Sequence, residues 1–412
     1  MNKRIQLDSI LLFALVIPFI MYYRIGPGDT PYWLFGLIFL GLLLNIIVDL
    51  LDIKAVLYNR LKQILLGFII LAVVGGAFFA AIVVRHQTHP IYMIHDMPLQ
   101  QEAAVRFLLD GKNPYANDYF GTFVEQWPYS GTETNPALYH FVLMPFYILF
   151  ALPFYFVGNH MFGYFDARMP LLFLFGLLLT LAYLLPLEKD KKRLFIVFLA
   201  FNPAMLGFML EGRSDVFMFT FMFTSFFLLH KGRLVLSGIP MALAFAIKQS
   251  AWPILPLYLA YLYFKTGNIG KTVRSLIPFV LTFVLIVLPF FLWDPKAFLD
   301  STVLYLSGGT PHSYPVSGYG LGRLLLQIGF ISDAQQYYPF QIWQVLISLP
   351  VLVLLIRFLK KSPDVFRLIV SYGIFLFVFW YLSRYFNNSH LGFLSLVFIT
   401  AYFWPEKKVS TK

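Results

Sequence analysis

The segment QILLGFIILAVVGGAFFAAIVV, residues 63–84, decides the class of this protein, because it runs for 22 residues without a charge. A membrane-spanning helix needs about 20 mostly apolar residues. The whole chain has the same character: 59% of its 412 residues are hydrophobic, 12% are charged, and the mean hydropathy is +0.73. Soluble proteins carry about 25% charged residues. The composition therefore excludes a soluble globular protein and intrinsic disorder, and predicts an all-α polytopic membrane protein.

The number of cysteines and the net charge exclude several kinds of site and partner. The chain has no cysteine, which excludes a disulfide scaffold, a cysteine-ligated metal site and a thiol nucleophile. Its net charge of +11 would suggest nucleic acid in a soluble protein. In a membrane protein such an excess is first expected on cytoplasmic loops, so we expect membrane lipids and no nucleic acid as partners.

Basic clusters recur between the apolar segments and predict a topology. The positive-inside rule assigns all of them, and both termini, to the cytoplasm of a multi-pass protein of the cell membrane. Two long hydrophilic pieces, residues 85–136 and 294–338, then form outer loops. The clusters are Lys3/Arg4, Lys54 to Lys62, residues 188–193, Lys231 and Arg233, Lys265 to Arg274, Arg357 to Arg367, and the tail 406–412.

One stretch does not fit the regular alternation of the chain between the two sides of the membrane. Residues 137–187 should cross an odd number of times, yet they hold two apolar blocks, 137–157 and 170–187. We expect the first block to enter from the outer face and return without spanning, which gives about 12 crossings, or 13 if it spans. The whole chain, 1–412, is then a single integral membrane domain. Short spans around 195–229 and 234–264 are typical of helices that border a cavity reached from one side.

The first outer loop holds the most informative acid. Asp96 precedes Pro98 at the start of a predicted short amphipathic helix lying at the membrane surface. Asp96 serves there either as a helix cap alone or as a reactive carboxylate near the lipid head groups. The neighbouring histidines are either solvated or ligands of a metal; they are His86, His89 and His95.

Other charges lie at the outer ends of apolar helices. The turn with Glu211, Arg213 and Asp215 is either a solvated hairpin or a functional site, since charge near lipid is costly. Lys248 and Arg384 either extend to the interface or hold a lipid phosphate. Carboxylates suit a general base, and cations suit a phosphate leaving group.

An ordered set of short motifs joins these positions. The set resembles the glycosyltransferase C superfamily, in the polyprenol-phosphate-dependent mannosyltransferase-like branch that includes the catalytic subunit of glycosylphosphatidylinositol mannosyltransferase I. The resemblance covers about Asp96 to Phe386. Its motifs are Asp96 with Glu102-Ala-Ala and Gly111-Lys-Asn-Pro-Tyr115, Asn202-Pro203, Gly212-Arg-Ser-Asp215, Lys231-Gly-Arg233, Ala244-Phe-Ala-Ile-Lys248, Pro253 with Pro256, Ser317-Gly-Tyr-Gly320 and Ser383-Arg-Tyr-Phe386.

The resemblance implies a bundle of about 12–13 transmembrane helices and an inverting hexosyltransferase. The donor would be a polyprenyl-phosphate sugar, with mannose favoured, and the acceptor a lipid or glycan at the outer face. Asp96 and Glu102 are the implied catalytic acids. The implied substrate-binding residues are Asp215, Arg213, Lys248, Arg384 and Tyr115. Ile94 stands where paired-acid relatives carry a second aspartate, and this leaves open whether a divalent cation is a cofactor.

Three other interpretations remain open from sequence. A transporter or flippase of lipid-linked sugars would translocate its substrate without forming a glycosidic bond, and internal inverted repeats typical of transporters are not visible. A polymerase of lipid-linked sugars would share the phosphate chemistry and the outer-loop site. A non-catalytic membrane subunit would tolerate alanine at both Asp96 and Lys248.

Overall fold

The computed structural model describes residues 4–22, 31–130 and 133–405 and is almost entirely helical. It confirms an all-α polytopic membrane protein. Helices before the midpoint are α1 (Leu7–Tyr22), α2 (Tyr32–Leu50), α3 (Ala55–Ile70), η1 (Leu71–Gly75), α4 (Gly76–Gln87), α5 (Asp96–Leu109), η2 (Pro136–Leu138), α6 (Phe146–Phe162), α7 (Arg168–Tyr183), α8 (Lys189–Ala200) and α9 (Leu206–Leu210). 

The second half continues the same pattern. Its elements are α10 (Asp215–His230), α11 (Leu234–Phe245), η3 (Gln249–Ile254), α12 (Leu255–Thr266), α13 (Ile269–Trp293), α14 (Pro295–Leu299), η4 (Asp300–Leu304), α15 (Tyr305–Ser307), β1 (Ser317–Gly318), α16 (Leu321–Gln327), α17 (Phe340–Lys361), α18 (Val365–Tyr381), β2 (Tyr385–Phe386) and α19 (Asn388–Phe403). The strands β1 and β2 pair in parallel.

The long helices have the length and composition of membrane spans. Among the described residues, α2, the continuous rod α3–η1–α4, α13 and α17 are each at least 18 residues long and apolar enough to cross a membrane. Only 17–33% of their most apolar windows is buried inside the protein, so most of this surface is left for lipid. Other rods are shorter, including α10 with 16 residues and α11 and α12 with 12 each. These lengths confirm the short segments expected around 195–229 and 234–264.

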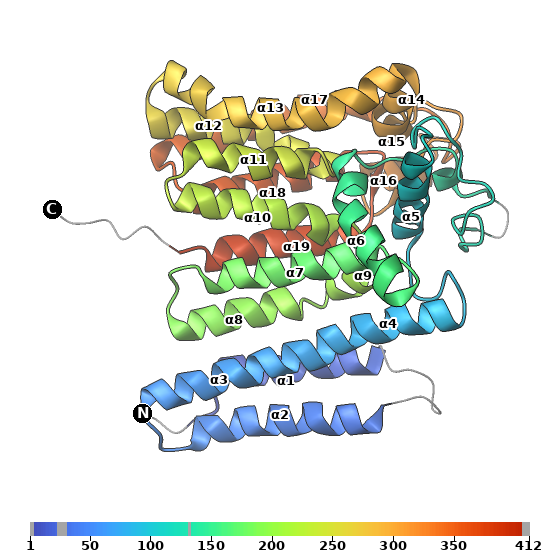
Figure 1. Ribbon diagram of the computed structural model, residues 1–412. Helices are drawn as coiled ribbons and strands as arrows, with labels where there is room; N and C mark the ends of the chain where they lie inside the picture. The colour runs from blue at the N-terminus through green and yellow to red at the C-terminus, as the bar shows by residue number, and fades with distance from the viewer. Residues whose placement is uncertain (1–3, 23–30, 131–132, 406–412) are drawn as a thin grey trace.

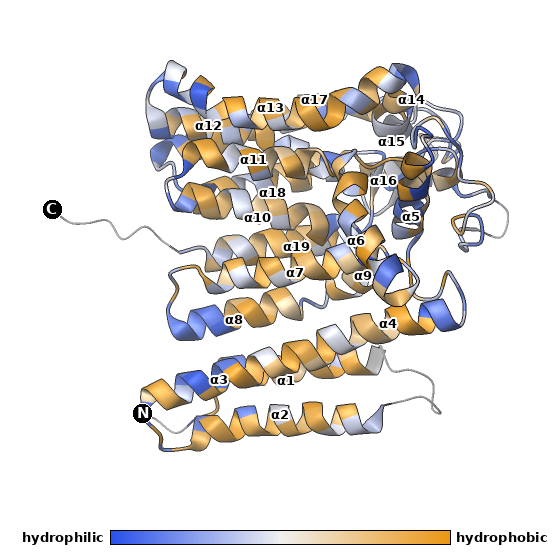
Figure 2. Ribbon diagram, viewed as in Figure 1, coloured by the Kyte–Doolittle hydropathy of each residue, from blue (hydrophilic) through white to orange (hydrophobic). Residues whose placement is uncertain are grey.

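The rods pack side by side into one bundle with two chemically different ends (Figure 1). The start of α1, the end of α19 and the basic turns between α2 and α3, α10 and α11, α12 and α13, and α17 and α18 gather at the end that we call the basic end. Figure 2 shows apolar rods between hydrophilic ends. We call the opposite end, which carries α5, α14, α15 and α16, the cavity end. Lys3 and the tail 406–412 lie outside the described residues.

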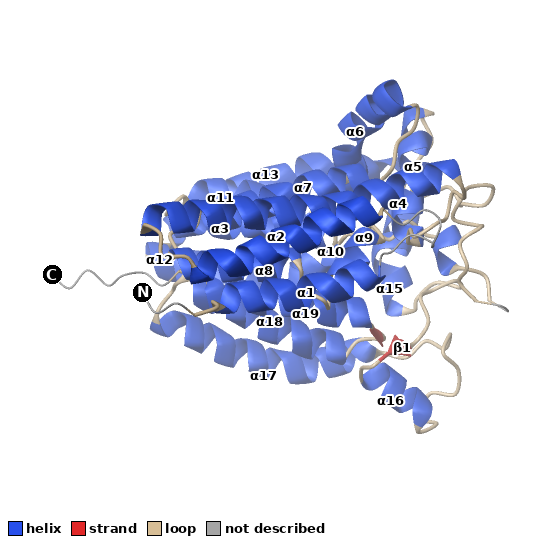
Figure 3. Cartoon of the chain, turned by 90° about the horizontal axis from the view of Figure 1, so that it is seen from below, coloured by secondary structure: helices blue, strands red, loops and turns tan. Residues whose placement is uncertain are grey.

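Two helices at the cavity end lie across the bundle direction (Figures 1 and 3). Helix α6 occupies part of the block 137–157 and has the orientation of a segment that does not span; its membrane placement stays a prediction. Helix α5 forms where the amphipathic helix is expected. It is embedded more deeply than a surface helix, because eight residues from Pro98 to Val105 are buried.

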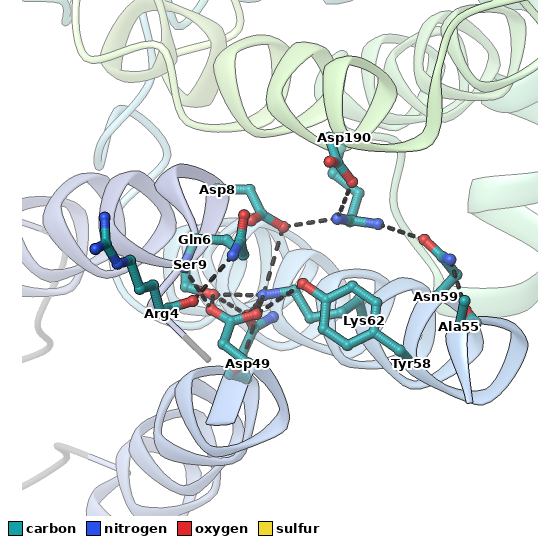
Figure 4. Close-up of polar contacts among 12 residues, drawn as sticks. Arg4, Gln6, Asp8, Ser9, Asp49, Ala55, Tyr58, Asn59, Lys62 and Asp190 are labelled. Carbon is teal, nitrogen blue, oxygen red and sulfur yellow. Dashed lines mark hydrogen bonds and ion pairs between the residues drawn. The ribbon is translucent and has the colours of Figure 1, made fainter. Parts of the chain in front are cut away.

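A buried polar network attaches the first helices to the bundle at the basic end (Figure 4). The Lys62 Nζ atom of α3 lies 3.0 Å from Asp49 Oδ1 of α2 and 3.4 Å from Asp8 Oδ2 of α1. Arg193 Nε of α8 donates to the same Asp8 oxygen at 2.7 Å. Lys62 is 0% exposed and Arg193 is 2% exposed. These two cations are therefore internal ion-pair partners, which corrects the expectation that the clusters holding them are loop charge alone.

Candidate active site

One cavity of about 430 Å³ lies at the cavity end and collects side chains that are far apart in the sequence. Five of the seven predicted site residues line it: Asp96, Arg213, Asp215, Lys248 and Arg384. They come from the start of α5, the turn between α9 and α10, the end of α11 and the segment after α18. The remaining wall is mostly aromatic and apolar, with contributions from Tyr305, Leu306, Phe340, Phe379 and Trp380.

Asp96 is the first residue of α5 and is held by two neighbours. Its Oδ1 atom lies 2.5 Å from His95 Nδ1, and its Oδ2 atom accepts a hydrogen bond from Asn135 Nδ2 at 3.1 Å. Burial raises the pKa of Asp96, but the charge and hydrogen bond of His95, the hydrogen bond of Asn135 and the charge of Arg213 together leave it below its ordinary value of 3.8. His95 occupies the N-cap position of α5, and Asp96 is the first residue of the helix itself. The helix-cap alternative for Asp96 therefore does not hold, and Asp96 is a charged carboxylate that faces the cavity.

The turn between α9 and α10 packs directly against the start of α5. The His95 amide donates to the Glu211 carbonyl at 2.9 Å, and Ser214 Oγ donates to Met97 Sδ at 3.0 Å. Gly212 has φ +87°, and a Cβ there would lie 2.9 Å from Pro98 Cγ. A left-handed backbone without a side chain is needed for this close approach. Glycine at this position therefore lets the turn bring Arg213 and Asp215 beside Asp96.

Two cations face the cavity with unused donors. Lys248 Nζ donates to Asp215 Oδ1 at 2.6 Å, and both side chains are largely buried, at 14% and 4% exposed. Arg213 Nε donates to Glu211 Oε2 at 3.1 Å, and its guanidinium lies over the Phe208 ring. Within the described residues, the terminal nitrogens of Arg213 and the other two protons of Lys248 have no hydrogen-bond partner. An ammonium and a guanidinium with free donors can receive a phosphate.

Arg384 makes hydrogen bonds that the sequence did not indicate. Its guanidinium donates to four backbone carbonyls of the loop 294–338, at Tyr314, Gln336, Ala334 and Gln335. Gly308 approaches it so closely that a Cβ would lie 2.6 Å from Nη1. Four of its five N–H groups are occupied in this way. Arg384 lines the cavity, but it holds the loop, and the geometry does not favour the predicted role of phosphate ligand.

Glu102 lies outside the cavity and is fully engaged. Its carboxylate forms a bidentate ion pair with Arg85, at 2.7 and 2.8 Å, and accepts from the Ala167 amide at 3.0 Å. Arg85 also contacts Asp166, which is bound in turn by Arg168. The network joins α4, α5 and the start of α7. The structure therefore places Glu102 as an anchor of α5 and not with the predicted catalytic acid.

Tyr115 also lies away from the predicted site. It is 3% exposed, and its hydroxyl donates to the Leu143 carbonyl at 2.8 Å. Its ring packs against Phe141, Phe290 and Phe298. Because the hydroxyl is used and the ring is surrounded, Tyr115 belongs to the core beneath the cavity and not to its lining.

The histidines of the first loop do not form a ligand set. His86 Nε2 lies 3.3 Å from Asp166 and its ring stacks on Tyr164, whereas His95 contacts Asp96. In the part of the chain that the structure describes, no three histidine, aspartate or glutamate side chains are grouped to hold a metal.

The sequence did not indicate several residues in the cavity wall or directly behind it. Asn135 sits before a Pro and caps η2, a local signal, but its bond to Asp96 spans 39 residues and leaves no sequence trace. His140 lines the cavity, and burial lowers its pKa despite the opposing charge of Asp300. Burial raises the pKa of the Tyr314 hydroxyl, because it disfavours the charged phenolate. These groups are neutral at physiological pH, which suits recognition of uncharged hydroxyls.

Comparison with known families identifies the chain. The family model of glycosyltransferase family 87 matches residues 141–383, more than half of the sequence. The chain belongs to glycosyltransferase family 87. It is therefore a membrane glycosyltransferase, and Asp215 and Lys248 lie inside the matched region of this family-87 chain, whereas Asp96 precedes it. No curated protein and no solved structure matches the chain.

Proposed function

We propose that this family-87 protein transfers a hexose, with mannose favoured, from a polyprenyl-phosphate donor to a lipid or glycan acceptor at the outer membrane face. The observation that carries the proposal is the cavity in which a charged carboxylate, Asp96, faces two cations with free donors, Arg213 and Lys248. The sequence resembles the branch of polyprenol-phosphate-dependent mannosyltransferase-like proteins, and this resemblance favours a polyprenyl-phosphate donor.

The cations suit the donor phosphate. A polyprenyl phosphate leaves as an anion that stays anchored in the bilayer, so it needs positive groups close to lipid. Arg213 and Lys248 supply them, and a low-dielectric wall strengthens the attraction. The apolar side chains of Leu306, Phe340 and Phe379 line the same cavity and suit the first isoprene units of the donor.

Asp96 suits the acceptor. As the acceptor hydroxyl oxygen bonds to the anomeric carbon, its proton passes to the Asp96 carboxylate. The bond between the anomeric carbon and the phosphate oxygen breaks, and its electron pair leaves with polyprenyl phosphate. Attack from the face opposite the phosphate inverts the anomeric centre. Although His95 and Asn135 each contact one Asp96 oxygen, every carboxylate oxygen has a second lone pair for the incoming hydroxyl.

The predicted outer-face location rests on charge. The cavity end lies opposite the basic end, and the positive-inside rule assigns basic loops to the cytoplasm. A donor presented on the outer leaflet would then reach the cavity directly.

Reconstitution tests the proposal. Purified protein in proteoliposomes receives radiolabelled polyprenyl-phosphate mannose on one side and octyl α-mannoside as the acceptor, with the glucosyl donor in a parallel assay. We expect a labelled disaccharide product with inverted configuration by NMR. Movement of the labelled lipid between leaflets without a new glycosidic bond would instead identify a transporter and contradict the proposal.

A further inference from the structure

A second, shallower pocket of about 290 Å³ opens beside the cavity. We call it the side pocket. Its walls share His95, Trp127 and Arg213 with the cavity, so the two spaces meet at these three side chains. Asp96 is the chain neighbour of His95 and lines the cavity next to this boundary. A molecule in the side pocket can therefore extend across this boundary toward Asp96.

Trp127 presents a fixed aromatic surface in this pocket. Its indole Nε1 donates to the Ile94 carbonyl at 2.9 Å, and its ring is tilted by 54° against His95 with centroids 5.1 Å apart. The side chain is only half-buried, so part of the ring is accessible. Amphipathic aromatic rings that are held rigidly provide contact area at little entropic cost.

Glu211 supplies a hydrogen-bond acceptor on the same pocket. Its side chain is 35% exposed, and Oε2 accepts from Arg213 Nε. Its Oε1 atom has no protein partner among the described residues. This oxygen can accept a hydrogen bond from a ligand that carries hydroxyl donors.

The backbone of this wall is unusual. Met93 has φ 47° and is the one non-glycine residue with a positive φ in the described part of the chain. Its carbonyl accepts from Arg168 Nη1 at 3.1 Å, so a buried arginine stabilises this conformation. Non-glycine residues adopt this region rarely because it strains the backbone, and such residues concentrate at functional sites. The strained residue therefore supports a ligand-binding role for the pocket that it lines.

We propose that the side pocket binds a hexose unit of the acceptor, with Trp127 stacking on the sugar ring and Glu211 accepting from its hydroxyls. The inference rests on the proposed transferase function and adds the place and chemical class of its acceptor. The unit bound there is a neutral carbohydrate, and the hydroxyl that reacts lies toward the His95–Arg213 boundary and Asp96.

Acceptor kinetics test the inference. In the proteoliposome assay with octyl α-mannoside, we expect Trp127→Ala to raise the KM for the mannoside about tenfold, near the upper range for one aromatic contact. The KM for the polyprenyl-phosphate donor should stay within about twofold. Trp127→Phe should restore most of the mannoside affinity, and Glu211→Gln should raise the same KM. Trp33→Ala is the control, since Trp33 is 71% exposed on α2.

The outcomes separate this inference from the function beneath it. A higher KM for the donor but not for the mannoside in Trp127→Ala would overturn the acceptor site. Donor hydrolysis by the unaltered protein without transfer to octyl α-mannoside would also overturn it. No turnover of the donor at all would instead refute the proposed function. Thermal unfolding in detergent shows whether each variant is folded. If Trp127→Ala is not folded, Glu211→Gln decides: an unchanged KM for the mannoside in that variant would overturn the acceptor site.

Discussion

At the scale of single residues, the surroundings of Asp96 determine when it can act as a base. The carboxylate must be charged to accept a proton, and His95, Asn135 and Arg213 lower its pKa below 3.8. Activity that needs the charged form is present above this pKa and is lost as the pH falls through it. We therefore expect the acid limb of kcat/KM in the unaltered protein to lie below about pH 4.

The Asn135→Ala variant tests this cause. It removes a donor to a charged oxygen, which contributes about 1.5–3 kcal/mol. The pKa of Asp96 should rise, and the acid limb of the pH–rate profile should move upward by at least about one pH unit. A limb that stays in place while activity falls uniformly would show that Asn135 acts on packing alone. Full recovery of activity after return to pH 7 serves as the control for acid unfolding.

Glu102 allows a catalytic role to be separated from a structural one. Glu102→Gln removes one charge from a buried network in which Arg85 also binds Asp166. Breaking a buried pair costs about 3–5 kcal/mol, so we expect a lower unfolding temperature. Activity per folded molecule should fall far less than in an Asp96 variant. A stable Glu102→Gln protein without activity would return Glu102 to the catalytic set.

At the scale of elements, Arg384 holds the loop 294–338 at the cavity. The loop contributes Tyr305 and Tyr314 to the lining, and the β1–β2 pair joins it to the segment after α18. Lysine cannot reach four separated carbonyls as a planar guanidinium does. We expect Arg384→Lys to increase hydrogen–deuterium exchange in peptides from 308–340 and to reduce activity through the disordered lining.

A matched control and an opposite outcome are available for this element. Arg323 is exposed on α16 in the same loop. Arg323→Lys is therefore the matched control and should leave hydrogen–deuterium exchange of the loop unchanged. If Arg384→Lys raises the KM for the donor while loop exchange stays as in the unaltered protein, Arg384 is a phosphate ligand after all.

The sequence predicted the elements better than the contacts within the site. Uncharged apolar runs report directly on spans, and the helix-end charges Asp96, Arg213, Asp215 and Lys248 do meet in one cavity. Partners are decided by side chains that fold back from distant segments. Glu102 and Arg384 have partners that the sequence did not indicate, because a charge at a helix end has the same appearance whether it meets substrate, Arg85 or four carbonyls.

At the scale of the whole molecule, the buried network at the basic end holds α1, α2, α3 and α8 together. The family match begins at residue 141, so Lys62 and Asp8 connect helices outside the match to a helix within it. Lys62→Met would leave Asp49 and Asp8 without one of their cations. We expect a loss of about 3–5 kcal/mol of stability, measured as thermal unfolding in detergent.

The control for this variant is Lys54→Met, at the exposed start of α3, which should change stability by less than about 0.5 kcal/mol. Equal unfolding temperatures for both variants would show that the network does not contribute to holding the bundle together. Because the cavity lies at the opposite end, residual activity of folded Lys62→Met protein should remain near that of the unaltered protein.

The central claim, that Asp96 in this cavity performs glycosyl transfer, is tested most directly by the Asp96→Asn variant in proteoliposomes with polyprenyl-phosphate mannose and octyl α-mannoside. The amide keeps the shape but cannot accept the hydroxyl proton, so transfer should fall by about 10²–10⁴-fold with donor binding retained. Asp110→Asn, at the exposed end of the same helix α5, should transfer normally. Near-normal transfer by Asp96→Asn would contradict the account.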